Sequence, residues 1–275
     1  MPEIMERSSR GRTTPRGRIA PIVAVGSGKG GVGKTWLSIS LAHAFAAAGK
    51  RVLLVDGDLG LANIDVQLGL NPESDLSAVM AGWIELDDAV SKVANGAGAG
   101  GFDVLPGRSG SAALAELPME ETARLAAGIA ALSLRYDHVL IDLGAGIEPN
   151  VMRLARAADR VVAVVNDEPT SLADCYAFIK QFRLYRPDST PWAAVNMADN
   201  RASGRRTHEA LSKACQSFLG FRPPLAGIVN RDPLVRDAIR AQVPLSIRHP
   251  RAPAWMDVKA MADALLEGVS MPDDR

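Results

Sequence analysis

The most informative segment of this chain is Gly26-Ser27-Gly28-Lys29-Gly30-Gly31-Val32-Gly33-Lys34-Thr35. Its second part matches the pattern G-x-x-x-x-G-K-[ST], in which the backbone N–H groups of a glycine-rich loop converge on phosphate oxygens. An apolar run, Ile22–Val25, precedes the loop, and a segment rich in alanine and leucine follows it. This order predicts a strand, a phosphate-binding loop and the N-terminus of a helix, whose dipole favours an anion.

Two lysines and a threonine carry the chemistry expected of this loop. Lys34 is expected to reach the β- and γ-phosphates of a nucleotide, and the Thr35 hydroxyl is expected to bind Mg²⁺. A glycine-rich turn without any ligand is the alternative, but acidic residues after later strands argue against it. The predicted nucleotide contacts in this region are Gly28, Lys29, Gly30, Gly31, Val32, Gly33, Lys34, Thr35 and Trp36.

Beyond the loop, short β-branched runs alternate with helical segments along the chain. Several runs lack polar alternation, as do strands that are covered on both faces. The alternation predicts an α/β fold with a doubly wound, mostly parallel sheet of seven to eight strands and helices on both faces. The predicted strands are Ile22–Val25, Val52–Asp56, Phe102–Leu105, His138–Asp142, Val161–Val165, Trp192–Asn196 and Leu225–Val229, and the helices include Lys34–Ala48, Met119–Tyr136, Ser171–Leu184 and Ser203–Phe218.

The overall composition excludes several classes of protein. Lys and Arg total 31, as do Asp and Glu, so the zero net charge argues against a globally basic nucleic-acid coat but leaves room for local basic patches. Cys175 and Cys215 have no metal-ligand spacing, which predicts free thiols. No apolar stretch approaches about 18 residues, so we expect neither secretion nor a membrane span, and therefore a cytoplasmic protein.

The segment Lys29–Thr35 resembles the deviant Walker A box of the MinD/ParA ATPases. The resemblance extends from about Ile22 to Leu266 and implies an enzyme that hydrolyses ATP slowly, with Mg²⁺ and under partner stimulation. It also implies an ATP-dependent homodimer, in which the first lysine crosses to the nucleotide of the other subunit. Carried over, Lys29 would stabilise transition-state charge only in the dimer. An exposed loop charge without this role is the alternative.

Acidic residues end two predicted strands at the edge where ligands of parallel sheets bind. Asp56-Gly57-Asp58 resembles the start of the family's switch I, which implies that Asp58 orients the attacking water and that Asp56 supports the metal and the loop. Asp142 ends an apolar strand in a Walker B pattern and would hold Mg²⁺ through water. The catalytic set is thus Lys29, Lys34, Asp58 and Asp142, and the metal set is Thr35, Asp56 and Asp142. Acids at strand ends also cap turns, which stays the alternative.

Further nucleotide contacts follow from the same resemblance. Asn63 would hold the nucleotide-dependent loop, and Gly146, in a segment resembling switch II, would sense the γ-phosphate through its N–H group. Asn196 ends a predicted strand with a carboxamide, which suits the donor and acceptor of an adenine edge. Asp232 and Pro233 are expected to line the base pocket. Thr170 or Ser171 is expected to cap the helix that follows Glu168.

Several stretches resemble the flagellar-number regulators of the FlhG (FleN) branch, among them Asp58–Val66, Gly144–Ile147 and Asp232–Arg236. This implies a switch that regulates flagellar number or placement, or another intracellular position, with partners in flagellar assembly or polar positioning. The chain departs from that branch in lacking an N-terminal D-Q-A-x-x-L-R motif, which puts coupling to the GTPase FlhF in doubt. The final segment, Pro253–Arg275, has an acidic polar side, so we expect it to pack on the sheet, and a C-terminal membrane anchor is not evident.

The domain organisation predicted from these patterns is simple. Residues 1–19, with five arginines among Ser, Thr, Gly and Pro, form a disordered basic tail; residues 20–270 form a single P-loop ATPase domain; and residues 271–275 form a short tail. The basic tail is either a solvated leader or a contact for acidic lipid, nucleic acid or protein. Peripheral attachment at the membrane or the cell pole is left open.

Two other functions remain open on the sequence. A ParA-like positioner of DNA or protein clusters would bind non-specific DNA in its ATP-bound dimer through basic patches such as Arg201, Arg205 and Arg206, which we expect in a loop at Ala198–Thr207. A solvated surface is the other interpretation of these arginines. A metabolic relative would need either cluster-ligating cysteines, which Cys175 and Cys215 do not supply, or a small-molecule substrate to amidate.

Overall fold

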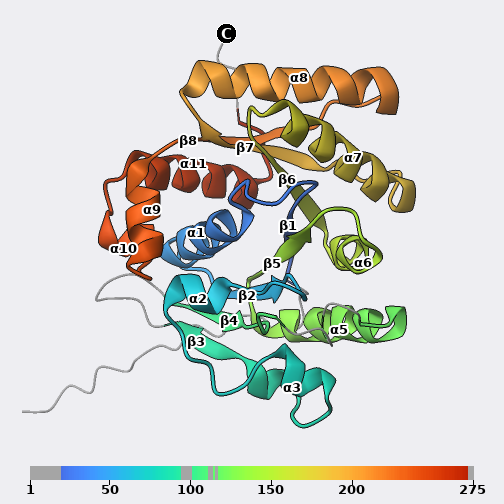
Figure 1. Cartoon of the computed structure of the whole chain (residues 1–275), viewed down its shortest axis with the longest axis vertical. Coiled ribbons are helices and arrows are strands. Elements are labelled where there is room, and N and C mark those ends of the chain that lie inside the picture. Colours follow the sequence, from blue (N-terminus) through green and yellow to red (C-terminus); the bar gives the residue numbers. More distant parts are fainter. Residues whose placement is uncertain (1–19, 94–100, 111–113, 115–116, 272–275) are drawn as a thin grey trace, which may run out of the picture.

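Eight strands form one sheet in the computed structural model, which describes residues 20–93, 101–110, 114 and 117–271 (Figure 1). Their order is β3-β4-β2-β5-β1-β6-β7-β8, and every neighbouring pair is parallel except β3 and β4. The predicted fold class is therefore confirmed. The strands are β1 (Ile22–Ser27), β2 (Val52–Gly57), β3 (Ser91–Val93), β4 (Phe102–Leu105), β5 (His138–Ala145), β6 (Arg160–Val165), β7 (Trp192–Ala198) and β8 (Leu225–Asn230).

Helices cover both faces of the sheet (Figure 1). One face carries α1 (Lys34–Ala47), α2 (Ile64–Leu68), α9 (Pro233–Arg240), α10 (Leu245–Arg248) and α11 (Pro253–Glu267), whose apolar side chains share one core cluster. The other face carries α3 (Leu76–Met80), α5 (Met119–Leu132), α6 (Pro149–Ala157), α7 (Pro169–Tyr185) and α8 (Arg201–Leu219), which share the second. Short 3₁₀ turns lie at Leu86–Ala89 and Ser133–Arg135.

Alternation of side chains along the central strands joins the two cores. In β1, Val23 and Val25 point into the first cluster, whereas Ile22 and Ala24 point into the second. Because side chains of a strand alternate between faces, a strand covered on both sides must be apolar throughout, as β1 is. The chain winds from β1 to β2 in one direction and from β6 to β8 in the other. The carboxyl end of β1 therefore lies at the change of direction, where ligands of such sheets bind.

The last described helix behaves as its sequence predicts. Trp255, Val258, Met261 and Leu265 of α11 are buried in the first core cluster, so its apolar stripe packs on the sheet side. Among the described residues, no helix is both long enough and apolar enough to cross a bilayer. The predicted tail at 1–19 and residues 272–275 lie outside the described residues, and Met271 donates its N–H to the Leu225 carbonyl at 2.9 Å.

Three local predictions were wrong. Arg201, Arg205 and Arg206 lie on the first turns of α8 and not in a loop, because Asn200 and Ser203 form a capping box that starts the helix at Arg201. Arg201 also pairs with the largely buried Asp257 of α11 at 3.2 Å. The helix predicted to reach Tyr136 ends at Leu132.

The start of α7 differs as well. Neither Thr170 nor Ser171 caps this helix: its N-cap is Glu168, which makes no side-chain cap bond, and Pro169 occupies the first turn. Ser171 instead accepts a hydrogen bond from the Asn166 N–H, which fixes the turn that leads from β6 into the helix.

Candidate nucleotide-binding site

The loop between β1 and α1 is a cradle that only glycine can form. Gly31 and Gly33 have φ angles of +79° and +84°, which side chains rarely tolerate. A Cβ atom at Gly28 would lie 1.9 Å from the Asp174 carbonyl oxygen, and one at Gly33 would lie 2.4 Å from Asn196 Nδ2. Helix α1 begins after Gly33 with no side-chain cap and no acidic residue in its first turn. Its first N–H groups are therefore directed at the loop, as an anion site requires.

Lys34 brings a buried positive charge to this cradle. The residue is 8% exposed, and burial lowers the pKa of its ammonium below 10.5, while the charges of Asp142 and Asp58 act in the opposite direction. Among the described residues its ammonium has no ion-pair partner within 4.0 Å. A buried cation with only partial compensation favours an anionic ligand, so the arrangement fits the β- and γ-phosphates.

Asp142 lies near Thr35, within β5, because the strand predicted to end at Asp142 continues to Ala145. Its carboxylate accepts a hydrogen bond from the Ser38 hydroxyl at 2.9 Å, and burial raises its pKa to about 6, although the nearby Thr35 hydroxyl acts in the opposite direction. No group of three or more His, Cys, Asp or Glu that could hold a metal occurs in the described residues. Mg²⁺ at a phosphate loop keeps waters and phosphate oxygens as ligands, so one hydroxyl with a carboxylate behind it is a fitting donor set.

Asp56 supports the loop that follows β2. It pairs in register with Asp142 on the neighbouring strand, and its carboxylate accepts backbone N–H groups of Asn63 at 3.0 Å, Ile64 at 3.1 Å and Asp58 at 3.3 Å. Burial, and then the charge of Asp142, raise its pKa to about 8. The loop-supporting half of its predicted role is visible in these contacts, and the metal-supporting half stays a prediction.

The structure brings Asp58 near Lys34 and Asp142, two of the other three charged groups of the predicted catalytic set. Its charge acts on both Lys34 and Asp142, and it lies against the end of β5, where a Cβ at Gly144 would be 3.4 Å from its Oδ1. The same oxygen accepts the Leu61 N–H at 3.1 Å, so the carboxylate also shapes its own loop. A carboxylate in this place can accept a proton or orient a water beside the phosphate cradle.

Gly146 and Asn63 contribute through the backbone and through local contacts. Gly146 has a φ of +100° and donates its N–H to the Ser27 carbonyl at 2.9 Å, so the segment after β5 is joined directly to the phosphate loop. Asn63 precedes α2, and its amide donates to the Leu61 carbonyl at 3.3 Å and accepts from Gln67 at 3.2 Å. Its predicted role in holding the loop thus has a local basis, and the nucleotide contacts of both residues stay predictions.

The predicted base contacts are engaged in structural hydrogen bonds. Asn196 is buried and donates its amide to the Val32 carbonyl at 2.8 Å, which fixes the phosphate loop from β7. Asp232 accepts the Leu234 N–H at 2.9 Å and the Ala254 N–H at 3.2 Å, and so joins the starts of α9 and α11, with Pro233 at the first turn of α9. Trp36 is buried against α9 and α10. An adenine contact by Asn196, Asp232 or Pro233, and a nucleotide contact by Trp36, stay predictions.

Lys29 is bonded to side chains at the start of α7 and not to other residues of its own loop. Its ammonium donates to Glu168 Oε2 at 2.5 Å and to the Thr170 hydroxyl at 2.8 Å, both at the start of α7. This contact also lowers the pKa of the Glu168 carboxyl. The partners are 139 and 141 residues away in sequence, so no local pattern identifies them. The Ser38 contact to Asp142 was missed for the same reason.

Comparison with known proteins agrees with this geometry. The family model for the CobQ/CobB/MinD/ParA nucleotide-binding domain matches residues 23–245. The antiactivator FleN of Pseudomonas aeruginosa is 38% identical over 241 residues, which cover 88% of this chain and 84% of FleN. The flagellum site-determining protein YlxH of Helicobacter pylori is 31% identical over 71% of this chain and 64% of its own.

A solved structure repeats the architecture. The septum site-determining protein MinD from Pyrococcus horikoshii, complexed with Mg-ADP, superposes with a TM-score of 0.74 over 90% of this chain and 98% of its own, at 24% sequence identity. At that identity the likeness concerns the fold. Together with the matched domain model and the identity to FleN, the glycine cradle and its carboxylates lead to one conclusion: this chain belongs to the CobQ/CobB/MinD/ParA nucleotide-binding family.

Proposed function

We propose that this protein is an ATP-dependent dimerising switch that regulates the number or placement of flagella. As a member of the MinD/ParA group it is a P-loop ATPase that uses ATP with Mg²⁺. The name of the Helicobacter relative supports a flagellar role. The two lysines of the loop and the carboxylates at the strand ends support the features particular to a switch.

The phosphate end of the site has a group for each task in hydrolysis. The loop N–H groups and Lys34 would bind the phosphates, and the Thr35 hydroxyl, with Asp142 behind it, would hold Mg²⁺, which neutralises phosphate charge when bound. Asp58, beside Lys34 and Asp142, would orient the attacking water. To sense the γ-phosphate, the Gly146 N–H would have to leave the Ser27 carbonyl to which it donates in this structure, and its return would follow hydrolysis.

The main observation in favour of a switch is that the two loop lysines, Lys29 and Lys34, have different surroundings. Lys34 is buried in the cradle, whereas Lys29 is partly exposed and bonded to Glu168 and Thr170 outside it. In this arrangement only Lys34 of the two loop lysines lies in the protomer's own phosphate cradle. The second can complete a site when it leaves Glu168 and reaches a nucleotide held by a partner subunit. Hydrolysis would then depend on the dimer, and ADP would let it separate.

Light scattering or sedimentation with ATP tests this proposal. Asp58→Ala should bind ATP without hydrolysing it and accumulate as a dimer, whereas Lys29→Met should stay monomeric under the same conditions. Lys50→Met, which removes an exposed lysine after α1, is the matched control and should behave as the wild type. An Asp58→Ala variant that stays monomeric at saturating ATP would exclude the switch.

The cellular role is tested separately. We propose that the protein acts in the cytoplasm, or peripherally at the membrane or a cell pole, and that its ATP-bound dimer engages proteins of flagellar assembly. Affinity capture from a flagellated host with the Asp58→Ala protein, compared with Lys29→Met, should enrich flagellar basal-body or flagellar transcription proteins. Recovery of DNA in their place would favour the ParA-like positioner.

A further inference from the structure

Helix α2 is a short helix that follows directly after the loop bearing Asp58. It has five residues, and the Asp56 carboxylate holds its N-terminal end through the Asn63 and Ile64 N–H groups at 3.0 and 3.1 Å. The loop between Asp58 and Asn63 is therefore attached to β2 at one end and to α2 at the other. Any tilt of α2 is passed to the loop and to the Asp58 carboxylate.

Gln242 contacts this helix at its middle residue, Val66, whose carbonyl also accepts the Gly69 N–H at 3.3 Å. Its Nε2 donates to the Val66 carbonyl at 2.7 Å, across 176 residues of sequence. Its backbone has a φ of +54°, a conformation that among the described non-glycine residues only Met197 shares. Such a φ costs about 1 kcal/mol for a residue of this kind. The cost is tolerated where the backbone must pass close to Gly69, at which a Cβ would lie 3.1 Å from the Gln242 Cβ.

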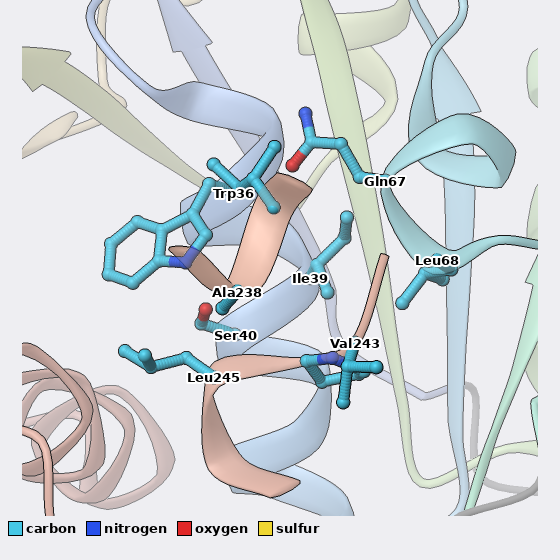
Figure 2. A pocket seen from close by; sticks show the side chains of 10 residues that line it. Trp36, Ile39, Ser40, Gln67, Leu68, Ala238, Val243 and Leu245 are labelled. Carbon is cyan, nitrogen blue, oxygen red and sulfur yellow. The ribbon is translucent and has the colours of Figure 1, made fainter. Parts of the chain in front are cut away.

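Between these two attachments α2 lies over a cleft that is incompletely filled (Figure 2). Trp36 and Ile39 of α1 line one side, Gln67 and Leu68 of α2 another, and α9 with the start of α10 the third. The Trp36 Nε1 donor and the Gln67 Oε1 acceptor are both buried and, within the described chain, both lack a hydrogen-bond partner. No hydrogen bond therefore joins these two side chains of α1 and α2, and α2 is held by its buried Ile64 and Leu68 together with the hydrogen bonds from Asp56 and Gln242.

We propose that Gln242 is a positioning residue for ATP hydrolysis, which acts by holding α2 and thereby the loop of Asp58. The inference rests on the proposed function, since it needs Asp58 to orient the attacking water. Gln242 belongs to the turn that follows α9, and α9 begins with Asp232 and Pro233 at the predicted base pocket. The same contact therefore links the base end of the site to its phosphate end.

Three substitutions separate positioning from a general loss of stability. Gln242→Leu removes the donor and keeps the backbone cost, so kcat should fall about tenfold, the equivalent of one hydrogen bond, with the KM for ATP changed less than about twofold. Gln242→Gly also removes the donor but adopts the positive φ freely, so kcat should fall equally while the melting temperature stays the same or rises. Gln242→Lys keeps a donor of similar reach and should regain most of the lost kcat.

Hydrogen exchange of the nucleotide-free protein measures how firmly Gln242 holds α2, without relying on catalysis. The amides of α2 and Gly69 should exchange faster in Gln242→Leu and Gln242→Gly than in the wild type, while those of α1 stay unchanged. Gln181→Leu, on α7, is the matched control for both experiments and should leave rates and exchange at wild-type values.

The possible outcomes separate the positioning role of Gln242 from the proposed function of the protein. Unchanged α2 exchange, or a Gln242→Gly protein that hydrolyses ATP at the wild-type kcat, would overturn the positioning role. So would kcat values that simply follow the melting temperatures of the three variants. If the Gln242 variants exchange faster in α2 but the wild-type protein itself does not hydrolyse ATP, the proposed function would be overturned, and the role of Gln242 in holding α2 would stand.

Discussion

The phosphate loop and the loop after β2 face the same site but are held in different ways. The phosphate loop is shaped chiefly by its own backbone: Gly31 and Gly33 adopt positive φ angles, and at Gly28 a side chain would collide with the Asp174 carbonyl, while Asn196 adds one hydrogen bond from β7. The loop after β2 depends more on side-chain hydrogen bonds, those of Asp56 to the start of α2 and that of Gln242 to Val66 in the middle of α2. A cradle must keep one shape, whereas a switch needs contacts that a ligand can break at modest cost.

The largest effect is expected from filling the cradle. Gly28→Ala would place a Cβ 1.9 Å from a backbone oxygen, which cannot move cheaply, so we expect a loss of about 3 kcal/mol in the free energy of unfolding. Gly30→Ala is the control for stability, because nothing lies within 4 Å of its Cβ position. Urea unfolding of the two variants compares them, and equal midpoints would mean that the cradle is not rigid.

A smaller loss is expected when the support of the cradle is removed. Asn196→Leu keeps the branched shape of the side chain, at a larger volume, but leaves the buried Val32 carbonyl without its 2.8 Å donor, at a cost of about 1–3 kcal/mol. Asn63→Ala removes only local contacts of the loop after β2, which we call the switch loop, and should cost less. Denaturant unfolding of both variants measures the difference, and the reverse order would contradict the contrast between the two loops.

The pH dependence of stability tests the attachment of the switch loop. The pKa of Asp56 is raised from 3.8 to about 8, so the folded state binds a proton that the unfolded state releases. The contribution of this group to stability is complete below about pH 4 and is lost as the pH rises toward about 8. Asp142, raised to about 6, acts in the same direction. Asp56→Asn should therefore flatten the stability profile between these limits, and an unchanged slope would exclude the protonated carboxyl.

The smallest effect on stability is expected at the contact of Lys29 with Glu168. The pair is exposed, and exposed ion pairs contribute little to folding. Glu168→Gln should leave the melting temperature nearly unchanged, while it frees Lys29 and so lowers the ATP concentration at which dimers form. A melting temperature that falls as far as that of Asn196→Leu would assign the contact a structural role instead.

Local patterns in the chain were sufficient for much of the fold. The strands follow from β-branched runs that are apolar on both faces, and the packed α11 follows from an apolar stripe. Local patterns were insufficient where an element is short or forms only through contacts with neighbouring elements. The edge strand β3 has three residues and exists through its pairing with β4, and α2 has five residues held by Asp56 and Gln242. The arginines assigned to a loop lie on α8 because a capping box begins that helix.

The amino-acid order therefore predicted the phosphate loop between a strand and a helix, with its glycines, Lys34 and Thr35, and it placed Asp58 directly after β2 and Asp142 in β5. Those assignments depend on the φ angles that glycine permits and on the meeting of parallel strand ends at one edge, both of which are local or periodic properties. The partners of Lys29, Asn196 and Gln242 became known only from the folded chain. Each of these contacts joins residues more than a hundred positions apart, and a hydrogen bond across that separation depends on how whole elements pack.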